Sequence, residues 1–402
     1  MANRLFPQAR EHWAIVMREY PTDAGITKAL FGTGRSYMWE REYGKAVEWF
    51  DKLTKDHLMT KDGREGLNFK GASYVRMGDQ MNAVKTYEQY TVMFPNGERI
   101  ESAHLNIIDA LREAGKYDEA NKWVQTTVTK FAGDPTEVNA LHARLRMEIF
   151  RGNWQAAILV ADSLLEGKTF GGSMVTSDEV KYLKALALEK LRKNVDAIGV
   201  LNSIRPNNTS YYSGLAFDKR NELISLGGSV VSSEVFPRPS EQGYPVMFKA
   251  DILKHAKRKD VDPRFMLAIM KQESSFRPNA KSPAGARGLL QFVFDTAIKY
   301  KDAAGYKNLQ PDDLYNPSIN IALGAEYIRF LKDEFDGLYE GIAASYNAGE
   351  DNALRWLGRT KPKDPGIFTA EVGFAETKNY VYKVMTNYRI YRELYDDNLN
   401  RW

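Results

Sequence analysis

Apolar residues in the first half of the chain recur at the three- and four-residue spacing of amphipathic helices, and the helices recur at a fixed interval. A four-residue string that ends in alanine returns five times. The five alanines are Ala46, Ala83, Ala120, Ala157 and Ala197, at successive intervals of 37, 37, 37 and 40 residues. Each unit is predicted to contain two amphipathic helices joined by a short polar turn. The small alanine would let the second helix pack closely against the first.

These units resemble tetratricopeptide repeats, although they are longer than the usual ~34 residues. One unit cannot bury its own apolar face, so the units are expected to stack into an α-superhelix. We place this superhelical domain at residues 1–226. A superhelix of this kind usually binds something on its concave side. A protein or glycan ligand is therefore expected there, and a rigid scaffold without a ligand is the alternative.

The helical period is lost at residues 227–245, where glycine, serine and proline are frequent. This segment is predicted to be a linker to a second domain at residues 246–402. In that domain the apolar spacing predicts helices that start at Pro263 and run over about 318–335 and 376–395. No alternating strand pattern is present in the sequence, so the predicted fold class is all-α.

Two shorter elements of the second domain are also expected. Residues 341–346 are small and apolar and predict a helix that could pass close beneath a cleft, ending at Asn347–Gly349. Residues 361–366 contain two prolines and a glycine, and predict a loop.

The helix at Pro263 carries the leading catalytic candidate. Asp262 is its predicted N-cap, and Pro263 suits the first helical position because its missing N–H costs nothing there. Met266 and Met270 lie on the apolar face of this helix. Glu273 falls seven residues after Met266, so a carboxyl group is predicted on the buried face at the C-terminal end of the helix.

Both features of that position raise the pKa of a carboxyl group, because burial and the negative end of a helix disfavour its ionised form. Glu273 is therefore predicted to hold its proton near neutral pH, as a general acid in glycoside cleavage must. The alternative is that Glu273 ends the helix and turns toward water. The loop that follows, Ser274–Gly285, is rich in glycine, serine and proline, which favours a functional site over a core position.

Composition excludes several other kinds of site. With 402 residues, two or three structural units are expected. The net charge of +4 is slight and no basic run suggests nucleic acid. The absence of cysteine removes disulfides, thiol nucleophiles and cysteine-based zinc sites, and the five histidines lack ligand spacing, so no metal and no cofactor are predicted. No apolar run reaches about 18 residues, and the N-terminal residues do not form a signal peptide.

Several separated strings in the second domain form a pattern. In chain order they are Gln272–Phe276, Gly288–Gln291, Asn316–Pro317, Asn320–Gly324, Ser345–Gly349 and Glu376–Val381. Together they resemble the family 1 lytic transglycosylases of bacterial cell walls, over about residues 244–395. Within that family the chain is most similar to the soluble members, which also carry an α-superhelix ahead of the catalytic domain. The resemblance implies a lysozyme-like catalytic fold.

The chain departs from the family pattern at three places. Leu290 stands where the family usually has methionine, a change that keeps the side-chain volume. Phe292–Phe294 replaces a frequent Met-Pro pair, and Glu350–Asp351 replaces a frequent Pro-Gly pair. These differences concern the shape of loops and subsites rather than the chemistry.

The resemblance implies that the substrate is the glycan strand of peptidoglycan, cut between N-acetylmuramic acid and N-acetylglucosamine. Glu273 would protonate the glycosidic oxygen and then act as base on the C6 hydroxyl of the sugar, leaving a 1,6-anhydro end. One carboxyl group suffices when the substrate supplies the nucleophile, whereas ordinary glycosidases use two. No Asp or Glu lies between Glu273 and Asp295, although a distant carboxylate could still fold into place. A periplasmic or cell-envelope location is also implied.

Four further residues match positions that hold substrate or line the cleft in the family. Ser282 and Gln291 correspond to residues that hydrogen-bond substrate or position the acid, Tyr346 to the tyrosine beside it, and Glu376 to a second acidic residue. Each also has a purely structural interpretation. Ser282 could be a turn residue, Gln291 a helix cap, Tyr346 part of the core, and Glu376 a charge favoured at a helix N-terminus.

Two other functions are consistent with the sequence. A hydrolysing muramidase of the goose-lysozyme kind would give reducing ends instead of anhydro ends. A repeat scaffold carrying a lysozyme-like domain without activity is the third hypothesis, and the presence of Glu273 argues against it.

Overall fold

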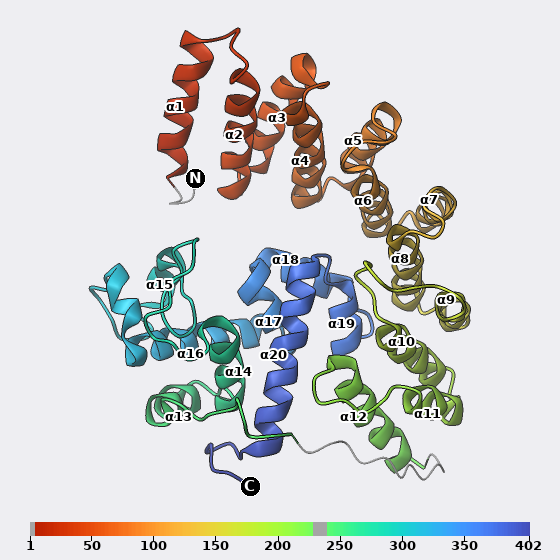
Figure 1. Cartoon of the computed structure of the whole chain (residues 1–402), viewed down its shortest axis with the longest axis vertical. Helices are drawn as coiled ribbons and strands as arrows, with labels where there is room; N and C mark the ends of the chain where they lie inside the picture. Colours follow the sequence, from red (N-terminus) through yellow and green to blue (C-terminus); the bar gives the residue numbers. More distant parts are fainter. Residues whose placement is uncertain (1–4, 228–238) are drawn as a thin grey trace. The chain divides into compact units, whose positions relative to one another are not determined.

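The computed structural model describes residues 5–227 and 239–402 (Figure 1). These described residues form twenty α-helices, one 3-10 helix and three isolated β-bridges, with no strand among them. The predicted all-α class is confirmed. The chain divides into two compact units. One holds the described residues up to Met147 together with Gly167–Ser173, and the other holds Glu148–Glu166 and Met174–Trp402.

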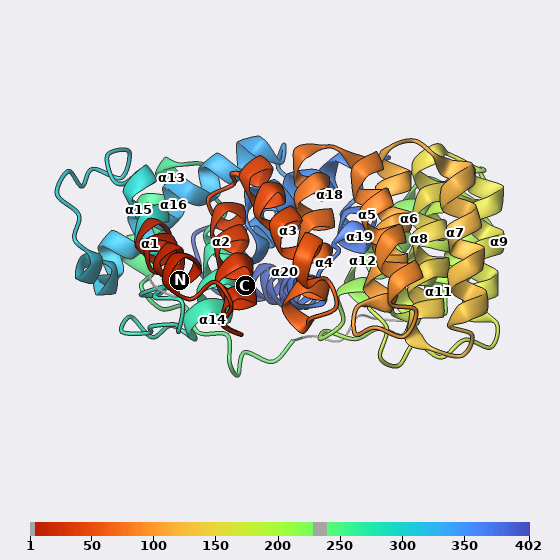
Figure 2. The same ribbon diagram turned by 90° about the horizontal axis from the view of Figure 1, so that it is seen from above.

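The first unit is an array of helices in which each helix from α1 to α7 packs against the next. Figure 2 shows α2, α3 and α4 side by side. The helices are α1 (Phe6–Glu19), α2 (Ile26–Trp39), α3 (Tyr43–His57), α4 (Lys61–Met77), α5 (Gln80–Met93), α6 (Ile100–Glu113) and α7 (Tyr117–Lys130). The next helix, α8 (Pro135–Arg151), begins in this unit.

The repeated string marks the first turn of the second helix in each predicted pair. The helices α3, α5 and α7, and later α9 (Trp154–Leu165) and α11 (Asn194–Asn202), each begin three residues before a repeat alanine. All five alanines have 0% of their surface exposed. The predicted close packing at the alanines, and hence the pairing of helices, is confirmed.

The turn within each pair contains one residue with a left-handed backbone. It stands five positions before the repeat alanine and is Arg41 (φ 64°), Gly78 (φ 76°), Gly115 (φ 72°), Gly152 (φ 75°) or Arg192 (φ 60°). A left-handed residue ends the first helix and lets the chain reverse. Glycine adopts this conformation freely, whereas the Cβ of arginine makes it costly.

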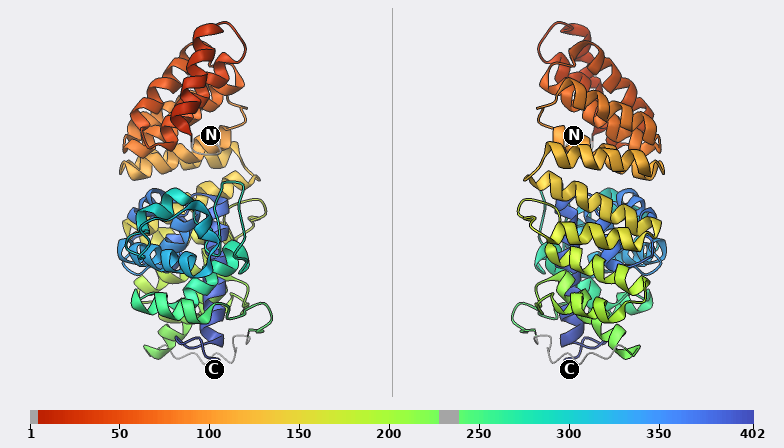
Figure 3. Two further views of the ribbon diagram at one scale, coloured as in Figure 1. Left: turned by 90° about the vertical axis from the view of Figure 1, so that its left-hand side faces the viewer. Right: turned by 90° about the vertical axis from the view of Figure 1, so that its right-hand side faces the viewer.

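The second unit begins with four helices that pack one against the next, α9, α10 (Ser177–Lys190), α11 and α12 (Tyr211–Ser225). They are coloured from yellow (α9) to green (α12) in Figure 3. The remaining helices are α13 (Lys249–Arg258), α14 (Pro263–Ser274), α15 (Phe294–Tyr300), η1 (Pro311–Tyr315), α16 (Pro317–Glu334), α17 (Tyr339–Ala348), α18 (Glu350–Gly358), α19 (Pro365–Glu371) and α20 (Ala375–Leu394). They share one apolar core.

The compact units do not follow the predicted boundary between residues 226 and 246. Helix α10 packs against α19, and α12 packs against α20, so α9–α12 belong to the unit that also contains the C-terminal helices. Buried polar contacts explain this, such as the hydrogen bond of 3.0 Å from the Tyr212 hydroxyl to the Gly366 carbonyl. Of the predicted linker at 227–245, residues 228–238 lie outside the described residues. The division into domains at 1–226 and 246–402 remains a prediction.

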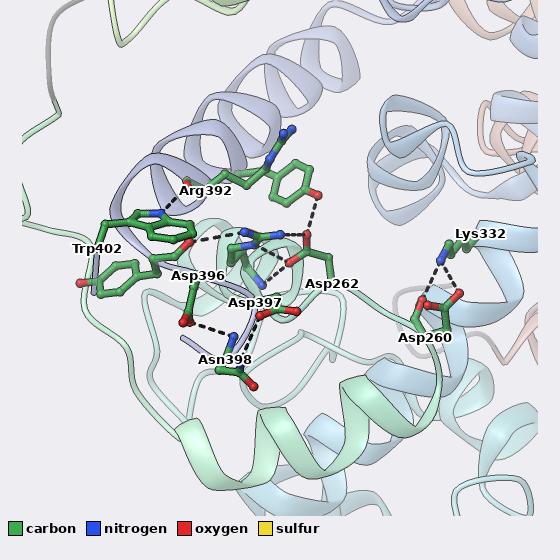
Figure 4. A network of polar contacts seen from close by, with 11 residues as sticks. Asp260, Asp262, Lys332, Arg392, Asp396, Asp397, Asn398 and Trp402 are labelled. Carbon is green, nitrogen blue, oxygen red and sulfur yellow. Dashed lines mark hydrogen bonds and ion pairs between the residues drawn. The ribbon is translucent and has the colours of Figure 1, made fainter. Parts of the chain in front are cut away.

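Helix α14 begins as predicted and is fixed at its start by polar contacts (Figure 4). Asp262 caps the helix by accepting a hydrogen bond of 2.9 Å from the backbone N–H of Arg264. The hydroxyl of Tyr388 on α20 donates to the same carboxylate at 2.8 Å. Just upstream, Lys332 of α16 pairs with Asp260 at 2.7 Å. The first turn of α14 is thereby held against α20.

One helix lies partly where a loop was expected. Helix α19 starts at Pro365, inside the segment 361–366. Asp364 is its N-cap and accepts hydrogen bonds from the backbone N–H groups of Gly366 at 2.8 Å and Ile367 at 3.0 Å. The Asp-Pro pair is the same start signal as at α14, and the prolines and glycine around it obscured that signal.

Candidate active site

Glu273 lies in the last turn of α14, on the predicted face. Met266 and Met270 on that face have 0% exposure, and Glu273 itself is only partly exposed. The chain leaves the helix through Ser275 (φ 50°) and Phe276 (φ 62°), two consecutive left-handed residues. These two residues end α14 and turn the chain directly into the following loop.

The carboxyl group of Glu273 accepts a hydrogen bond of 2.5 Å at Oε1 from the hydroxyl of Tyr380 on α20. Burial raises the pKa of Glu273 from 4.5 to about 7, and the hydrogen bond from Tyr380 opposes this because it favours the ionised form. The raised pKa agrees with the sequence prediction. With Oε1 engaged by Tyr380, Oε2 is the oxygen left to carry the proton.

No described carboxylate contributes to this pKa shift, whose causes are burial and the Tyr380 hydrogen bond. A second carboxylate close to Glu273 would raise the pKa further by like-charge repulsion. Among the residues that the structure describes, no carboxylate therefore acts on the ionisation of Glu273. This arrangement suits a reaction in which the substrate itself provides the nucleophile.

Tyr346 of α17 lies within electrostatic range of the same carboxyl group. Burial, and then the negative charge of Glu273, raise the pKa of the Tyr346 hydroxyl far above its usual range. Its oxygen is buried and has no hydrogen-bond partner among the described residues. The aromatic ring is packed against Tyr327 of α16 with a centroid distance of 5.1 Å. A fixed ring with an unused hydroxyl can bind a ligand group beside Glu273.

Gln291 shapes the loop that follows α14. Its backbone is left-handed (φ 50°), and its Nε2 donates to the carbonyls of Gly288 at 2.8 Å and Ala280 at 3.1 Å. Ser282 also bonds within the loop, since its Oγ accepts the backbone N–H of Ala286 at 3.1 Å. Neither side chain has a described hydrogen bond to Glu273.

The loop is anchored to the rest of the second unit by two buried polar side chains. The hydroxyl of Ser274, at the end of α14, lies 2.8 Å from the carbonyl oxygen of Leu289. Asn320 of α16 is fully buried, accepts the backbone N–H of Leu290 at 2.8 Å and donates to the carbonyl of Leu314 at 2.8 Å. These bonds hold the loop to the end of α14 and to α16.

Glu376 lies exposed in the first turn of α20, four residues before Tyr380. Its exposed position is consistent with both interpretations: a residue that contacts substrate, or a negative charge favoured at a helix N-terminus. The next residue, Thr377, is buried and donates to Oδ1 of Asn347 at 2.6 Å. This bond links the start of α20 to the end of α17, so the strings 345–349 and 376–381 meet in space.

The most important residue that the sequence interpretation missed is Tyr380. It lies inside the string Glu376–Val381, but no property of the string indicated that its hydroxyl would reach a residue 107 positions earlier. Spacing could have helped, because Tyr380 is four residues after Glu376 and lies next to it along α20.

A cavity of about 990 Å³ lies next to this site and is lined by the neighbours of Glu273 on α14, Gln272 and Ser275, and by Asn379 and Lys383 on α20. Tyr244 and Thr176 are also in its wall. Glu273 itself does not line this cavity. The described residues contain no group of three or more acidic, histidine or cysteine side chains arranged to hold a metal ion. No helix in the described ranges has the length and apolarity needed to cross a membrane.

Comparison with known proteins identifies part of the chain. Residues 251–368 match the family described as the transglycosylase SLT domain. The soluble lytic murein transglycosylase of Salmonella typhimurium is 31% identical over 156 residues, which is 38% of this chain and 24% of that protein. The match thus spans about a quarter of the length of that curated relative.

Two solved structures resemble the fold over nearly the whole chain. An inactive mutant of the lytic transglycosylase Slt from Pseudomonas aeruginosa matches with a TM-score of 0.58 and 16% identity, covering 95% of this chain and 77% of that one. The 70-kDa soluble lytic transglycosylase in complex with bulgecin A matches with a TM-score of 0.58 and 17% identity, covering 98% and 78%. Because the identities are only 16% and 17%, these structures show the fold alone, and they agree with the predicted all-α class.

Proposed function

We propose that this chain, which carries a transglycosylase SLT domain at residues 251–368, is a peptidoglycan lytic transglycosylase. It cuts the β-1,4 bond between N-acetylmuramic acid and N-acetylglucosamine and leaves a 1,6-anhydro end. The observation that carries the proposal is Glu273, a carboxyl group with a pKa of about 7 and no described acidic partner. A relative with a similar domain is named a soluble lytic murein transglycosylase.

Glu273 serves first as general acid. It donates the proton on Oε2 to the glycosidic oxygen, the bond from C1 of N-acetylmuramic acid to that oxygen breaks, and N-acetylglucosamine leaves with a free 4-hydroxyl group. The carboxylate that remains is stabilised by the hydrogen bond from Tyr380 at Oε1. The N-acetyl group of the substrate assists at C1 while the leaving group departs.

Glu273 then serves as general base. It takes the proton of the C6 hydroxyl, O6 bonds to C1, and the 1,6-anhydro ring closes. The proton returns to Glu273 and no water is consumed, so the enzyme is ready for the next cut. Tyr346 binds the sugar at this centre, a role supported by its buried hydroxyl, which has no hydrogen-bond partner among the described residues.

The remaining candidates take supporting roles. Gln291 uses its amide N–H groups to hold the loop and so positions the wall of the cleft. The Oγ of Ser282 accepts one backbone bond, which leaves its own proton for substrate. Glu376 is exposed at the start of α20, one turn before Tyr380, and we assign it a contact with substrate. We place the enzyme in the cell envelope, in the periplasm, where its substrate is found, with the helical repeats guiding a glycan or protein ligand.

The mass of the products tests this function. Purified peptidoglycan is digested with the full chain and with Glu273→Gln, and the soluble fragments are analysed by mass spectrometry. Anhydro ends, lighter than reducing ends by one water for each cut, support the proposal. Reducing ends would instead indicate a muramidase of the goose-lysozyme kind. Peptidoglycan that stays intact with the wild type would favour the scaffold without activity.

A further inference from the structure

The first two turns of α20 are held by three different helices. Thr377 donates to Asn347 of α17, and Tyr380 donates to Glu273 of α14. Lys378 and Tyr382, one turn apart, both point to α10, where they bond to the same side chain, Glu179. Tyr380 lies between these two residues in sequence, so any shift of this segment also moves the hydroxyl that bonds to the acid.

The contact with Glu179 is a buried ion pair with a second hydrogen bond. Lys378 Nζ donates to Oε1 at 2.7 Å, and the Tyr382 hydroxyl donates to Oε2 at 3.0 Å. Glu179 has 0% exposure and Lys378 has 3%. A paired charge that is buried in this way fixes geometry, because the ion pair and the tyrosine hydrogen bond are stronger in a low-dielectric environment than in water.

Helix α10 supports the carboxylate from its own side. Glu179 is in the first turn of α10, where the positive end of the helix favours a negative charge. Thr176 caps the helix by accepting the backbone N–H of Glu179 at 3.1 Å. The backbone of Glu179 is therefore fixed within α10, and its side chain is held by Lys378 and Tyr382 of α20.

We propose that Glu179 is a positioning residue for Glu273, acting through Lys378 and Tyr382 to hold α20 at the place where Tyr380 reaches the acid. The expected effect on catalysis rests on the proposed function. The expected effect on the pKa of Glu273 does not. A residue of a helix that the sequence assigned to the repeat region thus sets the geometry of the catalytic group. It touches no reacting atom.

The test measures the ionisation of Glu273 directly. The full chain with ¹³C-labelled glutamate carboxyl groups is titrated by NMR, and the Glu273 signal is assigned with Glu273→Gln. In Glu179→Gln, α20 is expected to shift and the Tyr380 hydrogen bond to lengthen, so the pKa of Glu273 rises above the wild-type value. Tyr380→Phe should give the same direction of change. In the combined variant, Glu179→Gln should add nothing to Tyr380→Phe.

The kinetic consequence is a fall in kcat with little change in KM, because the acid is misplaced while substrate contacts remain. Glu179→Gln is expected to lower kcat roughly 10-fold to 100-fold. Glu137→Gln is the matched control. Glu137 is also a buried first-turn carboxylate paired with a lysine, Lys168, but it belongs to the first unit. This control should leave the pKa of Glu273 and kcat at wild-type values.

Tyr382→Phe decides the matter if Glu179→Gln does not fold, since it removes one hydroxyl and leaves the ion pair intact. It should raise the pKa of Glu273 in the same direction by a smaller amount. If the pKa of Glu273 is unchanged in whichever of these variants folds, the proposal is overturned. It is also overturned if the pKa shifts of Glu179→Gln and Tyr380→Phe simply add in the combined variant. If the wild type does not cleave peptidoglycan, the proposed function fails, and the titration still decides the positioning role.

Discussion

The hydroxyl of Tyr380 lies 2.5 Å from Oε1 of Glu273, although the two residues are 107 positions apart in the sequence. Burial of Glu273 and the hydrogen bond from Tyr380 shift the pKa of the carboxyl group in opposite directions. Burial at the end of α14 favours the protonated form, and the tyrosine favours the ionised form. Their balance leaves the pKa of Glu273 at about 7, where the group can both give and take a proton.

Glu273→Gln is expected to abolish cleavage and keep the fold, because the amide has the shape of the acid but no proton to give. The release of anhydro fragments from peptidoglycan should fall to background, while circular dichroism at room temperature stays that of the wild type. Clearing of peptidoglycan at a near wild-type rate would contradict the assignment of Glu273 as the acid.

The same variant should be more stable than the wild type at high pH. Below about pH 4.5 the carboxyl group is protonated in both the folded and the unfolded state, and the fold bears no penalty. Between 4.5 and about 7 the unfolded state ionises first, so the wild type loses stability as pH rises. Above that range Glu273→Gln is expected to gain about 3 kcal/mol in free energy of unfolding.

Urea unfolding of both proteins at about pH 4 and about pH 8 measures this difference. Glu340 is another buried carboxyl group with a pKa of about 7, and it is present in both proteins, so its contribution cancels. An equal stability difference at the two pH values would mean that Glu273 titrates at its ordinary value.

Catalysis should decline as pH rises through about 7, because the acid form of Glu273 is then lost. Tyr380→Phe removes the donor that favours the ionised form, so the pKa of Glu273 rises and the alkaline limb of kcat/KM moves to higher pH. The variant should also lose roughly 10-fold in kcat, since the carboxylate formed during the reaction is less stabilised. A limb that moves to lower pH would refute this role of Tyr380.

Gly288→Ala and Gly285→Ala form a matched pair in the loop beside the acid. Both glycines have φ of 81°. A Cβ at Gly288 would lie 2.1 Å from the carbonyl oxygen of Leu314, whereas one at Gly285 meets nothing within 4 Å. Gly285→Ala should cost only about 1 kcal/mol for its backbone conformation. Gly288→Ala should cost about 3 kcal/mol or more and reduce activity, as measured by melting temperature and fragment release. An equal loss of stability in the two variants would show that the backbone around Gly288 can move to make room for the Cβ.

Arg192→Gly is expected to stabilise the protein by about 0.5–1 kcal/mol. Arg192 is exposed and left-handed at the turn position where three other repeats have glycine. Glycine removes the backbone strain, and its larger entropy in the unfolded chain offsets part of the gain. Gly152→Ala, at the equivalent turn, should destabilise by a similar amount. Thermal melts of the two variants should therefore move in opposite directions.

Much of the fold follows from local sequence signals. The repeat interval predicted the start of α3, α5, α7, α9 and α11, because alanine is small enough for close helix packing wherever it recurs. The start of α14 was predicted from Asp262 and Pro263, whose effects are confined to one helical turn. The raised pKa of Glu273 followed from its register on the apolar face of the same helix.

The contacts that complete the site could not be predicted in the same way. The bond from Lys378 to Glu179 joins residues 199 positions apart, and no periodicity connects a helix of the repeat region to one near the C-terminus. The compact division of the chain differs from the predicted boundary for the same reason. The sequence shows where the helical repeat pattern ends, whereas the division into compact units depends on which helices bury surface against each other.

The position of Glu179 on α10 bears on how the chain can be divided into fragments. A fragment that starts after residue 245 would contain the whole match to the transglycosylase SLT domain at residues 251–368, yet it would lack α10 and α12. Lys378 would face solvent without its carboxylate, and Tyr382 would lose both its hydrogen bond and the ring of Tyr211 stacked 5.4 Å from it. Expression of residues 246–402 alone would thus remove the contacts that hold α20.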